Sequence, residues 1–182
     1  MIKTAILVTF IGSFSFCQLF AVEKVTLPSL MAYPAAKEMN ISNYTNNKVL
    51  VFLNRTCPCT QQNIPYINKL TSEFPDIEFI GVHSKSGSSR EEINEVIEKY
   101  KPQFPVVDDS KLEIANILKA NRTPQVFILD KDNEVLYNGG VTDRTNPSQA
   151  TRFYLKNALA DLSANKPINE KLTRSLGCVI LR

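Results

Sequence analysis

The feature that most constrains the fold of this chain is an apolar segment that leads directly into a pair of cysteines. Residues 48–53 are apolar after the first position and rich in β-branched side chains, which is typical of a strand buried on both faces. Cys57 and Cys59 follow, and apolar side chains then recur at helical spacing over residues 60–74. A cysteine at a helix start lies beside free backbone N–H groups and the positive end of the helix dipole. We therefore expect a stabilised, reactive thiolate at Cys57.

Three further strand patterns predict the sheet. Residues 77–82 form a second buried strand, and residues 125–130 and 134–137 form two short strands joined as a hairpin. Strands that alternate with helices favour an α/β fold with a central parallel sheet flanked by helices, here made mixed by the antiparallel hairpin. A length of 182 residues with 43% apolar content suits a single domain, which we place at 48–163.

Three further helices are expected. Ser89 with Glu92, and Ser110 with Glu113, form capping boxes that each predict a helix start. The last helix is expected to run from about residue 147 to residue 163.

Residues 1–21 have the pattern of a secretory signal peptide, with one charge, Lys3, followed by an apolar run. That run is short for a membrane-spanning helix, so no stable membrane span is expected after cleavage near residue 21. Two alternatives stay open: an uncleaved anchor, and lipid attachment at Cys17, which the bulky Phe16 disfavours. We expect a periplasmic or secreted protein.

The net charge and the number of cysteines limit which partners and which disulfide pairings the chain can have. The net charge of +3 comes from scattered residues, so no nucleic acid is expected as a partner. The mature chain would keep Cys57, Cys59 and Cys178, and an odd number in an oxidising compartment leaves one thiol free, exchanging or paired with another chain. Cys178 lies in a tail, residues 164–182, with little expected regular structure, and residues 22–47 form a polar approach segment.

The motif spacing resembles the thioredoxin superfamily over residues 48–182. The separation from Cys57 to Pro65 is the family's separation from its first active-site cysteine to a helix-kinking proline. Thr60 then stands where the second thioredoxin cysteine would be, and the second thiol of this chain has moved to Cys59.

A second motif, at 121–127, is similar to the family's cis-proline loop, and the resemblance implies that Thr123 and Pro124 face the cysteines. A narrower similarity is to redoxin-like proteins of the alkyl hydroperoxide reductase and thiol-specific antioxidant group. It rests on four further segments, 104–108, 127–130, 137–140 and 173–180.

The resemblance implies a thiol-disulfide oxidoreductase that needs no cofactor and acts on protein thiols or disulfides, or with a redox donor protein. Cys57 would attack a partner disulfide, or the reverse, and Cys59 would release the resulting mixed disulfide. The partner backbone would lie as an added strand beside Thr123. Two departures from related families matter: Val51 replaces the buried Asp of thioredoxins, and Asn54 stands where peroxide-reducing relatives carry Thr or Ser, which weakens a peroxidase assignment.

The spacing of Cys57 and Cys59 has its own consequence. Residues two apart on a helix point to different sides, so a bond between them requires an unwound helix start or strain. A strained disulfide is more oxidising, which favours an oxidant or isomerase over a reductant. Alternatively, Cys178 on a mobile tail folds back to resolve a mixed disulfide at Cys57, or it is a packed, unreactive thiol.

Three other functions stay open. Paired thiolates are soft ligands, so Cys57 and Cys59 could hold Cu(I), with His83 at the same sheet edge as a candidate neighbour. A thiol peroxidase would form sulfenic acid at Cys57. A purely structural module would lose stability rather than activity when Cys57 is replaced.

Overall fold

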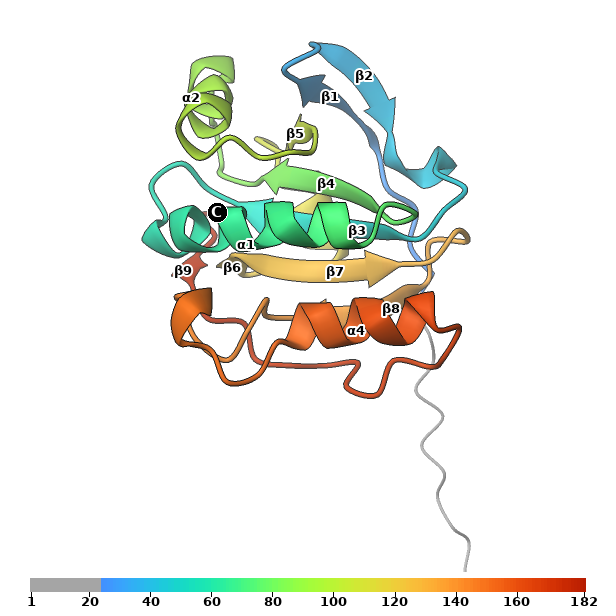
Figure 1. Ribbon diagram of the computed structural model, residues 1–182. Coiled ribbons are helices and arrows are strands. Elements are labelled where there is room, and N and C mark those ends of the chain that lie inside the picture. The colour runs from blue at the N-terminus through green and yellow to red at the C-terminus, as the bar shows by residue number, and fades with distance from the viewer. Residues whose placement is uncertain (1–23) are drawn as a thin grey trace, which may run out of the picture.

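Seven strands form one central sheet in the computed structural model, which describes residues 24–182 (Figure 1). These strands are β1 (Ser29–Tyr33), β2 (Lys37–Asn40), β3 (Lys48–Leu53), β4 (Glu78–His83), β5 (Val106–Asp108), β7 (Gln125–Leu129) and β8 (Val135–Gly139). Their order is β2-β1-β5-β4-β3-β7-β8; β3, β4 and β5 are parallel, and β7 and β8 are antiparallel to their neighbours. The mixed sheet is as predicted. The expected signal peptide, 1–21, with Cys17, lies outside the described residues.

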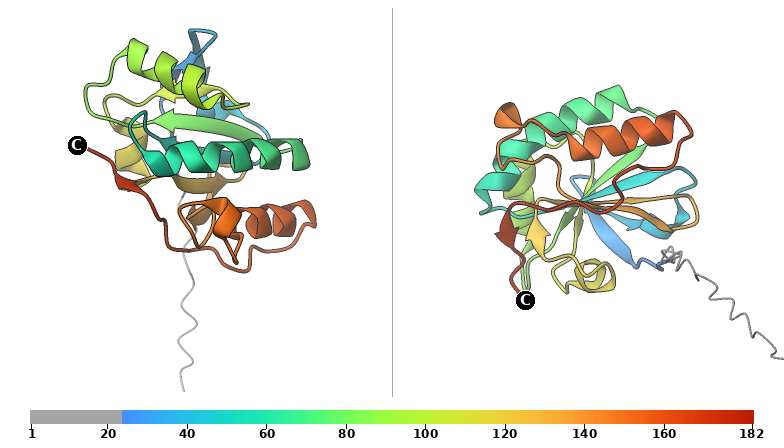
Figure 2. Two further views of the ribbon diagram at one scale, coloured as in Figure 1. Left: turned by 60° about the vertical axis from the view of Figure 1, so that its left-hand side comes forward. Right: turned by 90° about the horizontal axis from the view of Figure 1, so that it is seen from below.

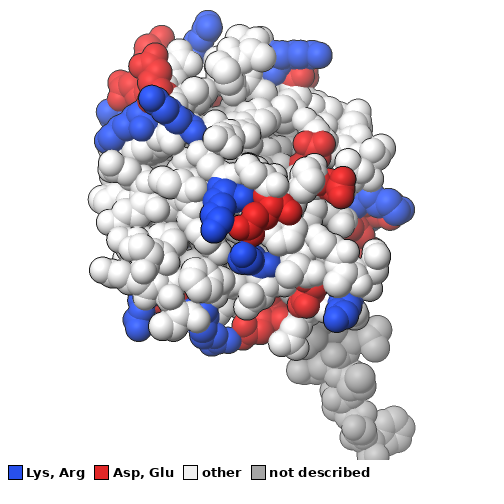
Figure 3. All heavy atoms as spheres, in the orientation of Figure 1, with Lys and Arg blue, Asp and Glu red and all other residues white. Residues whose placement is uncertain are grey.

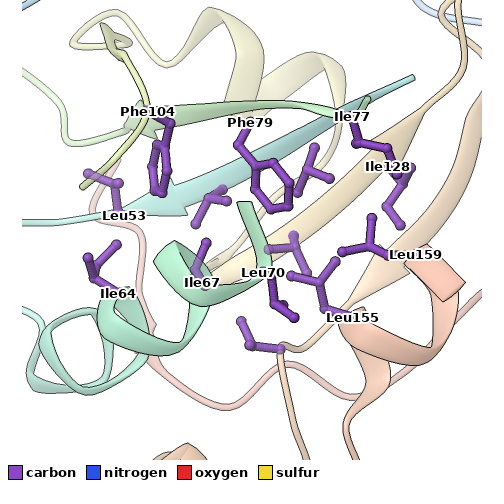
Figure 4. Packing of buried hydrophobic residues seen from close by; sticks show 14 of the residues in the cluster. Leu53, Ile64, Ile67, Leu70, Ile77, Phe79, Phe104, Ile128, Leu155 and Leu159 are labelled. Carbon is purple, nitrogen blue, oxygen red and sulfur yellow. The ribbon is translucent and has the colours of Figure 1, made fainter. Parts of the chain in front are cut away.

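Helices cover both faces of this sheet. One hydrophobic cluster contains buried side chains of α1 (Pro58–Glu73), α2 (Arg90–Tyr100) and α4 (Tyr154–Ser163), and a second contains those of α3 (Glu113–Ile117). Seen from below, α1 and α4 lie together over one face and α3 lies beyond the other (Figure 2). In the first cluster, labelled side chains of α1 point at the sheet and at α4 (Figure 4). The predicted α/β architecture, in a single domain, is confirmed.

Three strands of the sheet were not predicted. β1 and β2 lie within the segment 22–47, which we expected to be a polar approach, and β5 has only three residues. β2 is an edge strand with mostly exposed polar side chains, and β1 meets β5 through only two residue pairs. Such short or exposed strands lack the alternation that marks a strand in a sequence.

One of the two predicted capping boxes, Ser89 with Glu92, is confirmed. The Ser89 side chain accepts a hydrogen bond from the Glu92 backbone N–H, at 3.4 Å, and α2 begins at the next residue. The prediction that Ser110 and Glu113 form a capping box is wrong. The buried carboxylate of Asp109 instead accepts from the backbone N–H groups of Ile114 (3.0 Å) and Ala115 (3.1 Å), so α3 is short and begins at Glu113.

The last helix starts later than expected. Residues Pro147–Gln149 form a separate 3-10 turn, η2, and α4 begins at Tyr154. Between them, the carboxylate of Asp143 accepts from the backbone N–H groups of Thr151 (2.9 Å) and Arg152 (3.0 Å), which holds this segment in a loop.

No helix within residues 24–182 has the length and apolar character to cross a membrane.

The tail at 164–182 is tied to the domain along most of its length. It runs beside β8, where Asn138 donates to the Lys171 carbonyl (2.9 Å) and its own carbonyl accepts from Thr173 (3.1 Å). Its end forms β9 (Cys178–Val179), which pairs with β6 (Arg122–Thr123) as a separate two-stranded sheet. We expected little regular structure and a mobile end here; the structure shows backbone pairing instead.

Candidate active site

Cys57 lies in the turn between the end of β3 and the start of α1, as the sequence pattern predicted. It is the N-cap residue of α1, with Pro58 at the first helical position. Asn54 shapes the turn, because its side-chain oxygen accepts from the Thr56 backbone N–H (2.9 Å) and hydroxyl (3.0 Å). The Cys57 N–H donates to the Asn54 carbonyl (3.3 Å). Cys57 is only 1% exposed.

Thr60 takes a supporting position in the same turn. Its hydroxyl oxygen accepts from the Asn54 backbone N–H at 3.4 Å, and its side chain is fully buried. Its own backbone N–H is directed to the Cys57 sulfur. The position that carries the second cysteine in thioredoxins thus helps to hold the first cysteine here.

The loop at Thr123 closes the other side of the sulfur. The Thr123–Pro124 peptide bond is cis, as the resemblance implied. The Cys57 thiol donates to the Thr123 carbonyl oxygen at 2.9 Å. The Thr123 hydroxyl is buried and makes no hydrogen bond while Cys57 is a thiol, so it is free to donate to the thiolate.

Cys178 completes a group of three sulfurs. In the β6–β9 pair Cys178 stands opposite Thr123, which brings its side chain to the site. The sulfur atoms of Cys57, Cys59 and Cys178 all lie within 4.8 Å of one another, and all three cysteines are free. The strand position expected for a partner beside Thr123 is therefore occupied by the chain's own tail.

Hydrogen bonds make Cys57 the most acidic of the three thiols. Burial alone would raise its pKa, but hydrogen bonds from Cys178, from Thr123 and from the Thr60 backbone outweigh burial and lower the pKa to about 7. Burial, together with the hydrogen bond to Cys57 and the charge of its thiolate, raises the pKa of Cys178 to about 12. Burial and the same charge also raise the pKa of Cys59.

A charged rim next to the site was missed by sequence reasoning. Arg55 pairs with Glu92 (3.3 Å) and Glu95 (2.9 Å), and Lys85 pairs with Glu92 (2.6 Å), which links the cysteine turn to α2. Charges gather over α2 in Figure 3, whereas the surface over the first turns of α1 is uncharged. The spacing of these residues carries no sequence signal, because the pairs form across separate elements.

His83 reaches the expected sheet edge but does not join the sulfurs. It pairs in register with Leu53, one strand away from the cysteine turn. Its side chain is fully buried, neither ring nitrogen has a hydrogen-bond partner, and burial lowers its pKa to about 4. Among the described residues, the group of possible metal ligands contains the three cysteines and not His83.

Solved structures share this fold across most of the chain. An uncharacterised conserved protein from Geobacillus kaustophilus is 22% identical, covers 91% of this chain and 94% of its own, and has a TM-score of 0.78. A hypothetical protein from Sinorhizobium meliloti is 17% identical, with coverages of 87% and 95% and a TM-score of 0.71. A secreted disulfide oxidoreductase from Mycobacterium tuberculosis is 16% identical, with coverages of 75% and 90% and a TM-score of 0.51.

The sequence itself identifies the family. No protein with a curated description matches it significantly. The family model described as Redoxin matches residues 23–153, which include the cysteine turn and the cis-proline loop. The chain belongs to the redoxin family of thioredoxin-fold oxidoreductases, as its motifs predicted.

Proposed function

We propose that this protein is an exported thiol-disulfide oxidoreductase that exchanges disulfides with protein substrates through Cys57, with Cys59 and Cys178 as its partner thiols. One observation carries the proposal: the buried thiol of Cys57, with a pKa of about 7, lies within 4.8 Å of two further sulfurs. A thiolate that forms near neutral pH is both a nucleophile and a good leaving group.

The exchange needs the cysteines of this chain, a substrate with two thiols, and a partner disulfide that afterwards reoxidises the protein. In the oxidised protein, Cys57 forms a disulfide with Cys59 or Cys178, and a substrate thiolate breaks it to give a mixed disulfide. A second substrate thiolate then attacks the substrate sulfur of that mixed disulfide. The substrate leaves as a disulfide, and both electrons stay on the protein as two reduced cysteine sulfurs.

The electrostatics favour an oxidant. Hydrogen bonds from Cys178 and Thr123 stabilise the thiolate of Cys57, which exists only in the reduced protein. Stabilising the reduced form makes the disulfide more oxidising.

Export is proposed from the segment at residues 1–21. The structural likeness to a secreted mycobacterial disulfide oxidoreductase supports the same compartment. Disulfide exchange of this kind operates in oxidising compartments.

The test is the reduction potential of the protein, measured by titration in glutathione buffers with mass mapping of the disulfides, on wild type and on Cys178→Ser. We expect a reversible disulfide that contains Cys57. Its reduction potential should be less negative than that of thioredoxin, which is about −270 mV. Failure to form any reversible bond would exclude the proposal. Stoichiometric sulfenic acid formation at Cys57 with peroxide would favour the peroxidase alternative.

A second candidate, binding of Cu(I), is favoured by the three-sulfur group. A trigonal ion with metal–sulfur bonds of about 2.3 Å holds its sulfurs about 4.0 Å apart, which fits within the observed 4.8 Å limit. Thiolates are soft ligands and suit Cu(I). Anaerobic titration of the reduced protein should show one ion and a thiolate charge-transfer band. Because Cys178 would bind the ion directly, Cys178→Ser should weaken Cu(I) binding by more than roughly 100-fold, the loss seen when a residue that only supports a ligand is replaced.

A further inference from the structure

The C-terminal strand fills the place where an extended substrate would pair. β9 is antiparallel to β6, with Cys178 opposite Thr123 and Val179 opposite Arg122. Figure 2 shows the two strands side by side at the end of the molecule where the chain terminates. A peptide that adds a strand to this edge needs the same backbone groups of β6. With β9 docked, that edge is closed to it.

Contacts on both sides of Cys178 hold β9 in place. Before it, the Gly177 carbonyl accepts from the Arg122 guanidinium at 3.0 Å. After it, the Ile180 backbone N–H donates to the Asn121 carbonyl at 3.0 Å, and the Ile180 side chain is only 2% exposed in the second hydrophobic cluster. These contacts make β9 part of the folded domain and not a loose end.

Gly177 is what permits so close an approach. A Cβ atom built there would lie 2.1 Å from the Thr123 carbonyl oxygen and 3.0 Å from the backbone nitrogen of Pro124. Both neighbours are backbone atoms of the cis-proline loop, so neither can move aside cheaply. Any side chain at residue 177 is therefore incompatible with β9 in its observed position.

The same packing decides which sulfur a substrate can reach. Cys57 is 1% exposed, because the cysteine turn, the Thr123 loop and β9 enclose it. Cys59 and Cys178 are partly exposed. The most acidic thiol is thus the least accessible, and the partly exposed sulfur of Cys178 lies within 4.8 Å of it.

We propose that substrate thiols attack this protein at Cys178, with Cys57 as the leaving group, and that β9 replaces the strand a substrate would otherwise add. This inference rests on the proposed function. The substrate thiolate attacks the sulfur of Cys178 in a Cys57–Cys178 disulfide, and the breaking bond leaves its electron pair on Cys57 as a thiolate. The substrate's second thiolate then displaces Cys178, which takes up a proton. A partner protein that carries a disulfide then restores the Cys57–Cys178 bond by the reverse steps, and the partner leaves as a dithiol.

The geometry also limits the substrate. It needs an accessible pair of thiols that reaches the surface at Cys178, and it needs no extended segment paired with Thr123. Thiols on folded surfaces or in small dithiol molecules meet this requirement, because attack occurs at a partly exposed sulfur and not inside the groove.

The test identifies the cysteine that first forms a mixed disulfide with an added thiol. The oxidised full-length protein is mixed with glutathione, quenched with acid within the first turnover, alkylated and mapped by mass spectrometry. We expect glutathione on Cys178 and an alkylated, newly released Cys57. Glutathione on Cys57 or Cys59 as the first adduct would overturn the inference.

A substitution outside the three cysteines tests whether β9 covers Cys57. Gly177→Ala should displace β9 and raise the alkylation rate of reduced Cys57 by about tenfold or more, because local opening exposes it. The rate is measured above pH 9, where Cys57 is ionised with or without the hydrogen bond from Cys178. Val179→Ala is the matched control, since this side chain is 58% exposed in the same strand and should leave the rate unchanged. Equal rates in both variants would contradict a covering role for β9.

The two proposals fail differently. If no reversible disulfide forms in glutathione buffers, the proposed function itself is wrong. If such a disulfide forms but glutathione adds first to Cys57, only the inference about Cys178 is wrong. Should Gly177→Ala not fold, the adduct position in the wild-type protein still decides.

Discussion

The cysteine turn and the C-terminal tail deliver sulfur atoms to the same place by different means. In the turn, Asn54 and Thr60 fix Cys57 through hydrogen bonds between residues close in sequence. In the tail, Cys178 arrives through pairing with a strand more than fifty residues away. Both regions lower the pKa of Cys57, because the Cys178 side chain and the Thr60 backbone both donate to its sulfur, and we infer that the tail in addition limits access to that sulfur. Replacing residues in each region should separate these contributions.

The largest effect is expected in the turn itself. Cys57→Ser should reduce disulfide exchange by at least roughly 10³-fold, because no other described thiol has a lowered pKa. Stability should change by less than about 1 kcal/mol, since a serine hydroxyl can also donate to the Thr123 carbonyl. Insulin reduction or oxidative refolding assays measure the activity, and urea unfolding measures the stability. Unchanged activity with a large loss of stability would instead indicate a structural module.

The next effect belongs to the tail. Ile180→Ala should lower the free energy of unfolding by about 2–5 kcal/mol, because it empties a buried position that anchors β9. Leu181→Ala is the matched control, as this neighbour is 63% exposed and should change stability by less than about 0.5 kcal/mol. Urea unfolding of both variants measures the difference. Equal stabilities would mean that the tail end does not pack on the domain.

The same contrast explains what the sequence could predict. The turn, its helix and the buried strands were predictable, because strand 48–53 and the helical spacing after Cys57 are local patterns. β9 and its register with Thr123 were not, because a two-residue strand has no periodicity and its partner is distant. The odd cysteine count did leave a resolving role open for Cys178, but only the fold brings its sulfur within 4.8 Å of Cys57. The Asp109 cap was missed because its carboxylate acts five and six residues ahead, outside the capping-box spacing.

A smaller effect should appear in the pH dependence of the reduced protein. The pKa of Cys57 is lowered from 9.0 to about 7 by folding, so between pH 7 and 9 the unfolded chain binds more protons than the folded one. Stability should therefore rise across this window, by on the order of 2 kcal/mol, and this contribution is lost as pH falls through 7. Above pH 9 the raised pKa of Cys178 reverses the slope, because the folded protein then holds the extra proton. Urea unfolding of wild type and Cys57→Ser over this range measures the joint contribution of Cys57 and of its effect on Cys178, and parallel curves would contradict it.

The smallest effect separates hydrogen bonding from charge as the source of acidity in the turn. Thr123→Val removes the hydroxyl that lowers the pKa of Cys57, so alkylation at pH 7 should slow by roughly two- to fivefold. Arg55→Gln removes the nearby cation, whose guanidinium is already paired with Glu92 and Glu95, and should leave the rate unchanged. Ultraviolet titration of the thiolate in both variants gives the pKa directly. A larger shift for Arg55→Gln than for Thr123→Val would mean that the charged rim, and not the turn and the Thr123 loop, holds the thiolate.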